Sequence, residues 1–395
     1  MRRYTILRDI TGASTSEPFG GGVAGGNLES RSLAPPEPRV DVESLAPRDV
    51  RSLARDPEVV GIAPVMPTRL IRPFEVAAGA AATSAWGIEA VGADRSDFTG
   101  AGCVVAVLDT GIDAAHPAFA GVELVQRDFS GSGDGDRQGH GTHCAGTIFG
   151  HDVDGTRIGI ARGVERALIG KVLGDDGSGD SDMIFRGIQW ALQEGADVVS
   201  MSLGFDFPGL VEDLVNRQRW PVDLATSVGL EAYRGNLRMF DALMVMVRAR
   251  TAFDEGTILC AASGNESRRQ ENEQFEVAAS LPAAAEGVVS VGALARGEQG
   301  FTVAPFSNTF PQVSAPGVDI LSARRGGGLR SLSGTSMATP HVAGVTALWW
   351  EATPATASRP SSLGVLAKIL ASARADAFAP GVDEADRGLG IVTAP

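Results

Sequence analysis

At 395 residues, 44% hydrophobic and 21% charged, the chain has the composition of a globular protein with room for a large domain and a smaller one. Its formal net charge of −14 argues against nucleic acid or an anionic membrane surface as the main partner. Because no apolar run is long enough for a signal-peptide core or a membrane span, we expect a cytoplasmic protein with no membrane partner.

The N-terminal part, residues 1–78, is expected to form a small α+β domain. Its pattern predicts an edge strand at 4–10, a short helix at 47–56 and extended chain at 58–71. A Gly-, Ser- and Pro-rich excursion at 12–38 interrupts this unit, and a linker of small residues ends it.

Residues 79–395 show a different pattern, with apolar runs separated by helical segments. The runs lie at 104–109, 167–173, 196–203, 257–263 and 287–294. Helices are predicted between them at 181–196 and 229–253. Runs this continuously apolar suit strands covered on both faces, so the predicted fold class is α/β, a doubly wound and mainly parallel sheet. In such sheets the ligand site lies beyond the carboxyl ends of the strands.

Four polar residues are placed where that site should be. Asp109 and Asn265 each follow an apolar run directly, while His140 and Ser336 each stand near the start of a predicted helix. Taken singly, Asp109 and Asn265 read as turn residues and Ser336 as a helix cap. Together they supply a nucleophile, a base, an orienting carboxylate and an oxyanion donor. His143, three residues after His140, is assigned a structural role.

The motifs around these residues resemble those of the subtilisin-like serine proteases, the subtilases or peptidase S8 family. The matching stretches are LDTGID, GHGTHCAG, SLG, SGN and GTSMATPHVAG, in the family's order of aspartate, histidine and serine. The resemblance implies a triad of Asp109, His140 and Ser336, with Asn265 donating to the oxyanion. It also implies two strands that pair with an extended peptide or protein substrate, Ser202, Leu203 and Gly204 in one and Ala262, Ser263 and Gly264 in the other.

The N-terminal domain resembles the family's propeptide, which occupies the cleft of its own protease. That resemblance implies an autoprocessing site within 67–85. We therefore expect a monomeric serine endopeptidase, made as a self-inhibited zymogen, that acts through an acyl-enzyme on Ser336. The alternative is a catalytically silent scaffold that binds peptides or a partner protein.

Three further features of the sequence bear on the site. An extra segment around 205–228 either narrows the cleft or is an inert surface insertion. Cys144 follows the histidines, and bulky thiol reagents are predicted to inhibit through it; the other two cysteines are expected to be buried. No cofactor and no metal are expected, although Asp152 and Asp154 leave structural calcium open.

Overall fold

The computed structural model describes residues 1–11, 35–75, 85–253, 256–354 and 360–395. At the N-terminus it has one helix and three strands: β1 (Arg2–Asp9), β2 (Pro38–Leu45), α1 (Pro47–Leu53) and β3 (Val59–Pro64). The strand order is β2-β1-β3, and both pairings are antiparallel. The prediction of an edge strand at 4–10 is therefore wrong, because β1 has a neighbour on each side.

Two predictions for this unit fall on residues that are not described. Most of the excursion at 12–38 lies there, with β2 already beginning at Pro38. The domain boundary after residue 78 lies there entirely, so the division into 1–78 and 79–395 stays a prediction.

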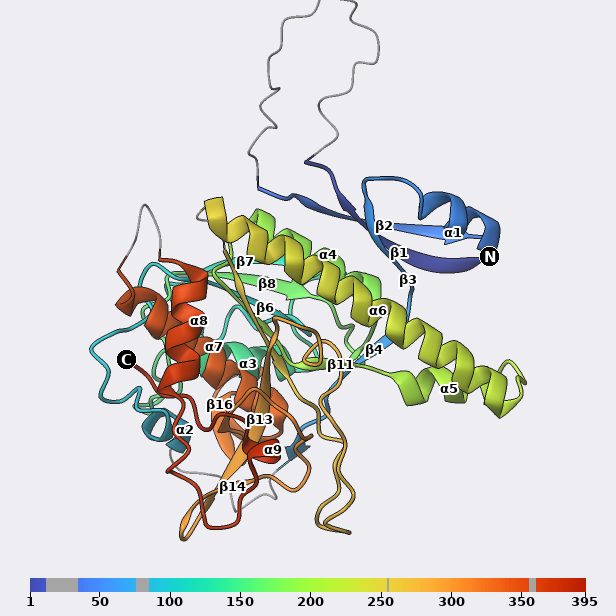
Figure 1. Cartoon of the computed structure of the whole chain (residues 1–395). Helices are drawn as coiled ribbons and strands as arrows, with labels where there is room; N and C mark the ends of the chain where they lie inside the picture. The colour runs from blue at the N-terminus through green and yellow to red at the C-terminus, as the bar shows by residue number, and fades with distance from the viewer. Residues whose placement is uncertain (12–34, 76–84, 254–255, 355–359) are drawn as a thin grey trace, which may run out of the picture.

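A mixed sheet forms the centre of the larger part of the chain (Figure 1). Its strands are β6 (Val104–Asp109), β7 (Glu123–Asp128), β8 (Arg166–Lys171), β10 (Val198–Met201), β12 (Ile258–Ala262), β13 (Val289–Gly297), β14 (Gly300–Val303) and β15 (Val313–Pro316). They are ordered β14-β13-β12-β10-β6-β8-β7, with β15 also paired to β13. Only the β13–β14 pairing is antiparallel among these described strands. The predicted doubly wound α/β class is confirmed.

The sheet separates two hydrophobic cores. Successive side chains of a strand point to opposite faces. In β6, Val105 and Val107 accordingly belong to one core, whereas Ala106 and Leu108 belong to the other. This explains why the strand is apolar throughout instead of alternating with polar residues.

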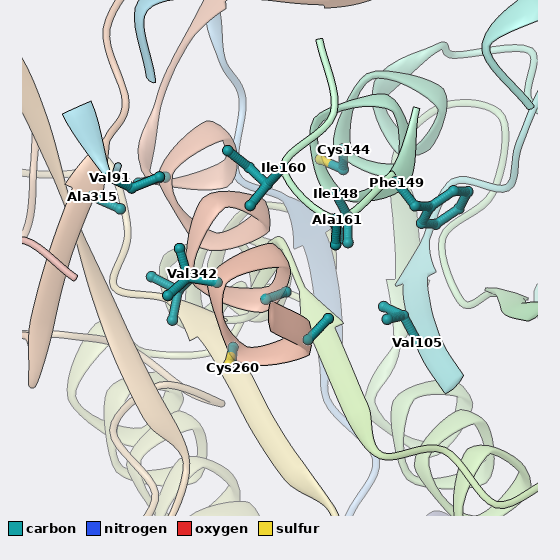
Figure 2. Close-up of a cluster of buried hydrophobic side chains, with 14 of the residues drawn as sticks. Val91, Val105, Cys144, Ile148, Phe149, Ile160, Ala161, Cys260, Ala315 and Val342 are labelled. Carbon is teal, nitrogen blue, oxygen red and sulfur yellow. The ribbon is translucent and has the colours of Figure 1, made fainter. Parts of the chain in front are cut away.

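Helices cover both faces of the sheet. One face carries α3 (His140–Phe149), α7 (Thr335–Ala352), α2 (Trp86–Ala90) and α8 (Ser362–Ser372); the other carries α4 (Ser181–Gln193) and α6 (Val222–Arg250). Figure 2 shows part of the first core around α7, including Val342 of that helix, Ile160 and the strand residue Cys260. A short helix, α9 (Glu384–Arg387), lies near the C-terminus. No helix among the described residues combines the length and the apolar character needed to cross a membrane.

The predicted extra segment folds as α5 (Phe207–Asn216) and the first turns of α6. The Asp206 side chain caps the N-terminus of α5, accepting a hydrogen bond from the Gly209 N–H at 3.0 Å. The helix predicted at 229–253 begins earlier, at Val222, directly after Pro221. The pair projects from the body of the molecule beside β11 (Leu203–Phe205), as Figure 1 shows.

The N-terminal sheet packs against α4 and α6 (Figure 1). The Asn236 amide of α6 donates to the Pro64 carbonyl at 2.8 Å, and the Val40 N–H donates to the Gln189 side chain of α4 at 3.0 Å. From β3 the chain runs on into β4 (Pro67–Leu70), which lies between β11 and β9 (Ser178–Asp180) in a separate antiparallel sheet. A third small sheet has the order β16-β17-β5, formed by Ile320–Ala323, Leu329–Ser333 and Phe74–Glu75.

Candidate active site

Asp109 and His140 form a close, buried pair. Asp109 ends β6 and His140 begins α3, and both side chains are essentially inaccessible to solvent. The imidazole Nδ1 lies 2.8 Å from Oδ1 and 3.0 Å from Oδ2 of the carboxylate. Burial by itself lowers the pKa of His140, but the charge and hydrogen bond of Asp109, together with Cys144, outweigh it, so the pKa stands well above its ordinary value. The pairing fixes the ring so that Nε2 faces away from Asp109.

A residue that the sequence reasoning missed, Asp136, holds the first turn of α3 in place. Its carboxylate accepts hydrogen bonds from the N–H groups of Gly139 and Thr142, at 2.6 and 2.9 Å, and from the Thr110 hydroxyl at 3.0 Å. Gly141 is required beside it, because a Cβ there would lie 2.2 Å from the Gly111 carbonyl oxygen. Asp136 is 6% exposed, so this network is sheltered from water and positions His140 against β6.

Ser336 lies in the first turn of α7, where the leading N–H groups have no acceptor within the helix. Its hydroxyl donates to the carbonyl oxygens of Ile71 and Ser202, at 3.2 and 3.3 Å. His140 Nε2 is buried and has no hydrogen-bond partner among the described residues. The structure therefore contains the carboxylate–imidazole bond, whereas the serine hydroxyl is bonded to backbone carbonyls.

The amide of Asn265 is held in one orientation by Thr335, a second residue that the sequence reasoning missed. Asn265 Oδ1 accepts hydrogen bonds from the backbone N–H and the hydroxyl of Thr335, at 2.9 and 2.8 Å. Its Nδ2 consequently points into the cleft, where it donates to the Arg72 carbonyl at 3.1 Å. This side-chain amide is thus a preorganised donor beside Ser336.

The other two side chains singled out in this motif are fully buried. His143 Nε2 lies 3.0 Å from the Ile320 carbonyl, and burial lowers its pKa to about 3, so the ring is neutral. Cys144 Sγ lies 3.7 Å from His140 Nδ1 and 3.4 Å from the Ser336 carbonyl. Burial raises the pKa of this thiol, which makes it a slow nucleophile. Inhibition through Cys144 stays a prediction.

One of the two expected substrate strands pairs with a peptide segment of this chain. Leu203 and Gly204, in β11, pair with β4, and the Ser202 hydroxyl donates to the Ser336 carbonyl at 3.1 Å. The second strand expected, at 262–264, is replaced by β9.

Residues 262–264 form hydrogen bonds with parts of the chain other than the cleft segment. Ala262 ends β12, and the Ser263 N–H donates to the Val291 carbonyl at 3.0 Å. The Gly264 N–H donates to the Thr335 hydroxyl at 3.3 Å. With these N–H groups occupied, the stretch does not pair with β4, whose partners are β11 and β9.

Residues 67–74 lie along a cleft of about 920 Å³. The Leu70 N–H donates to the Gly177 carbonyl at 2.8 Å, and the Ile71 side chain is only 3% exposed. The nearest Ile71 atom lies 3.5 Å from where a Cβ on Gly204 would stand. The segment is therefore seated as an extended peptide whose Ile71 carbonyl faces Ser336.

The two acidic residues considered for calcium do not converge on one point. Asp152 forms an ion pair with Arg162 at 2.9 Å, and Asp154 occupies a left-handed turn position with φ of 49°. Within the described residues, the one group of three possible metal ligands is Asp109, His140 and Cys144, whose ligand atoms lie within 4.8 Å of one another. Those groups already form the cluster around His140.

A buried Asp–His pair and a helix-borne serine at the edge of an α/β sheet define a candidate serine-hydrolase site. Residues 100–390 match the model of the subtilase family, Peptidase_S8. The chain therefore belongs to the subtilase family and is, by family, a subtilisin-like serine protease, as the motifs predict.

Relatives of known name agree with this assignment. The chain is 35% identical over 257 residues to the intracellular serine protease of Paenibacillus polymyxa, covering 63% of this chain and 67% of that protein. It is 31% identical over 316 residues to subtilisin-like protease 1 of Arthroderma gypseum, covering 75% and 54%. It is also 31% identical over 319 residues to the subtilisin-like serine protease Pen ch 13 of Penicillium rubens, covering 77% and 67%. The chain thus spans about half to two thirds of the length of these relatives.

The expected cytoplasmic location is wrong in the light of these relatives. Most of them are fungal subtilisin-like proteases, and they give no support to a cytoplasmic protein, although one relative is named an intracellular protease. The expectation rests on finding no apolar run of signal-peptide length in the sequence, and such an absence carries no conclusion about location.

Proposed function

We propose that this chain is a serine endopeptidase that hydrolyses peptide bonds of peptide or protein substrates through an acyl-enzyme on Ser336. His140 accepts the hydroxyl proton as Ser336 attacks the substrate carbonyl, and then donates that proton to the leaving amine. Asp109 holds the ring tautomer and stabilises the imidazolium. Asn265 Nδ2 and the Ser336 N–H stabilise the oxyanion, and water then releases the acyl group by the reverse sequence.

The observation that supports this proposal most strongly is the position of the chain's own residues 67–71. Residues 67–70 form the strand β4 between β9 and β11, and the carbonyl oxygen of the next residue, Ile71, lies 3.2 Å from Ser336 Oγ. A substrate in the same groove would present its carbonyl to the serine and its backbone to both strands. The backbone pairing explains how many different sequences could bind in one orientation.

We also propose that the segment restrains the enzyme as part of a self-inhibited zymogen. The Ser336 hydroxyl hydrogen-bonds to the carbonyl oxygens of Ile71, the group that it would have to attack, and of Ser202, while His140 Nε2 has no partner among the described residues. The Asn265 amide donates to the Arg72 carbonyl, one residue further along. Because attack requires the hydroxyl proton to point at the imidazole and the oxyanion donor to face the attacked carbonyl, the segment is bound in an unproductive arrangement.

Intact-mass measurement of the wild-type chain and of Ser336→Ala, together with digestion of a peptide library, tests both parts. The wild-type chain should hydrolyse library peptides and shorten by cleavage within 67–85. The Ser336→Ala chain should do neither, while circular dichroism shows that it is folded.

Different results would contradict the proposed peptide hydrolysis and the proposed zymogen. A wild-type chain that digests the library but keeps its full mass would remove the zymogen and leave the protease. A folded wild-type chain that cleaves nothing and takes no fluorophosphonate label on Ser336 would favour the catalytically silent scaffold.

A further inference from the structure

The register of β4 assigns each of its residues to a place along the cleft. Arg69 pairs with Gly204 on one side and with Ser178 on the other. Since the Ile71 carbonyl is the one that faces Ser336, Arg69 is the third residue before the peptide bond presented to the nucleophile. A substrate strand bound in the same way would place its own third residue, here called the P3 residue, at this position.

Two carboxylates lie beside the side chain at this position. Arg69 is 43% exposed, and its guanidinium lies 3.1 Å from Asp206 Oδ1 and 3.7 Å from Glu266 Oε1. The neighbouring residues of the strand, Thr68 and Leu70, are buried instead, at 2% and 5% exposure. The cleft therefore encloses the side chains at the adjacent positions and presents negative charge to this one.

Each carboxylate is also anchored by groups outside the segment. Asp206 follows β11 and caps α5 through the Gly209 N–H. Glu266 follows Asn265 and accepts a hydrogen bond from Asn308 Nδ2 at 2.8 Å. Neither side-chain anchor involves Arg69, so both are independent of it, although the Asp206 N–H itself donates to the Pro67 carbonyl of the segment at 2.9 Å. A preorganised pair of this kind favours a cation over a neutral side chain in the same place.

We propose that Asp206 and Glu266 make this protease prefer substrates with Arg or Lys at the P3 residue. The preference rests on the proposed peptide hydrolysis, of which it specifies the substrate class. Ion pairs this exposed contribute little each, so the expected preference is modest: about three- to tenfold in kcat/KM for Arg over Gln at P3. A Glu at P3 should be cleaved more slowly than Gln.

Competition between matched peptides tests the preference on the full chain. Three peptides share one sequence that the full chain cleaves in the library, except at the P3 residue, which carries Arg, Gln or Glu, and mass spectrometry follows their cleavage in one mixture. The ratio between two peptides is independent of how many enzyme molecules have an open cleft, because the same molecules cleave both. Asp206→Asn retains an acceptor for the helix cap, and Glu266→Gln retains one for Asn308.

Wild type should favour Arg over Gln about three- to tenfold at low salt, and less at high salt because exposed charges are screened. Each single variant should lower the ratio, and the double variant should bring it close to one. Asp213→Asn, which removes a carboxylate paired with Arg217 on α5, should leave the ratio as in wild type.

A wild-type ratio near one, or a ratio that survives in the double variant, would overturn the preference while peptide hydrolysis stands. A folded wild-type chain that cleaves no library peptide and takes no fluorophosphonate label on Ser336 would instead overturn the proposed hydrolysis and the preference with it.

Discussion

The two halves of the catalytic cluster are in different states. Asp109 and His140 are joined by contacts of 2.8 and 3.0 Å that involve only the body of the enzyme. Ser336 instead has two backbone acceptors for its hydroxyl, the Ile71 carbonyl of the segment lying in the cleft and the Ser202 carbonyl of the enzyme body. The acid–base half is thus set by the body of the enzyme alone, whereas the cleft segment supplies one of the two acceptors of the nucleophile's hydroxyl. This contrast leads us to propose that release of the segment, and no rearrangement of β6 or α3, activates the enzyme.

Removing the Ser336 hydroxyl should have the largest effect on activity. In Ser336→Ala the kcat/KM for a library peptide should fall by about 10⁶, because the acyl-enzyme cannot form. His140→Ala should cost about as much, and the double variant should be no worse than either single one, since the groups act as a unit. Steady-state kinetics with active-site titration measures this. Additive losses would argue against a shared mechanism.

Altering the Asp109–His140 pair should lower activity nearly as much. Asp109→Asn leaves a hydrogen-bonding group of the same size, yet kcat should fall by about 10⁴ because the ring tautomer is no longer fixed. The carboxylate also raises the pKa of His140, so the imidazole stays protonated to higher pH and activity appears only as pH rises through that pKa. The acid limb of the kcat/KM profile should therefore move to lower pH in the variant. An unmoved limb would show that another group controls it.

The oxyanion donor should have an intermediate effect. Asn265→Ala should lower kcat by about 10² to 10³ with little change in KM, as loss of the equivalent donor does in subtilisin itself. Thr335→Val removes the hydroxyl that orients the amide but leaves the backbone bond at 2.9 Å, so its loss of kcat should be smaller. Equal losses of kcat in Asn265→Ala and Thr335→Val would mean that the Asn265 side chain acts by holding the local backbone in place and not by donating to the oxyanion.

A substitution in the cleft segment should change the rate of peptide hydrolysis least. Arg69→Glu places a third carboxylate beside Asp206 and Glu266, so the segment should bind less tightly and the full chain should start with activity raised by about tenfold or less. Arg48→Glu, an equal charge change on the exposed face of α1, serves as the control. Initial rates of freshly purified chains measure both. An unchanged rate for Arg69→Glu would mean that these ion pairs do not hold the segment.

The sequence predicts most of the sheet and the identities at its catalytic edge. Asp109 directly follows a continuously apolar run, and His140 and Ser336 stand in long motifs at helix starts, so local pattern suffices to find them. Asp136 could not be found in this way, because an aspartate in a Gly-rich stretch looks like an ordinary turn residue until the Thr142 and Thr110 contacts are seen.

Long-range strand pairing is the part that local sequence does not encode. β4 pairs with residues more than a hundred positions away, and neither partner strand exceeds three residues. The failed prediction at 4–10 has a similar cause, since the pattern of β1 is the same whether one or two strands flank it. The choice of β9 over 262–264 as the second cleft strand depends on which backbone N–H groups are already engaged.

The most direct test of the account follows a fluorophosphonate probe on the full-length wild-type chain over time, with peptide mapping of the labelled residue and intact mass in parallel. We predict label on Ser336 alone, slow in the intact chain and fast once the chain has been cut within 67–85, with none in Ser336→Ala. A folded, shortened chain without label on Ser336, or an intact chain labelled as fast as the shortened one, would contradict it.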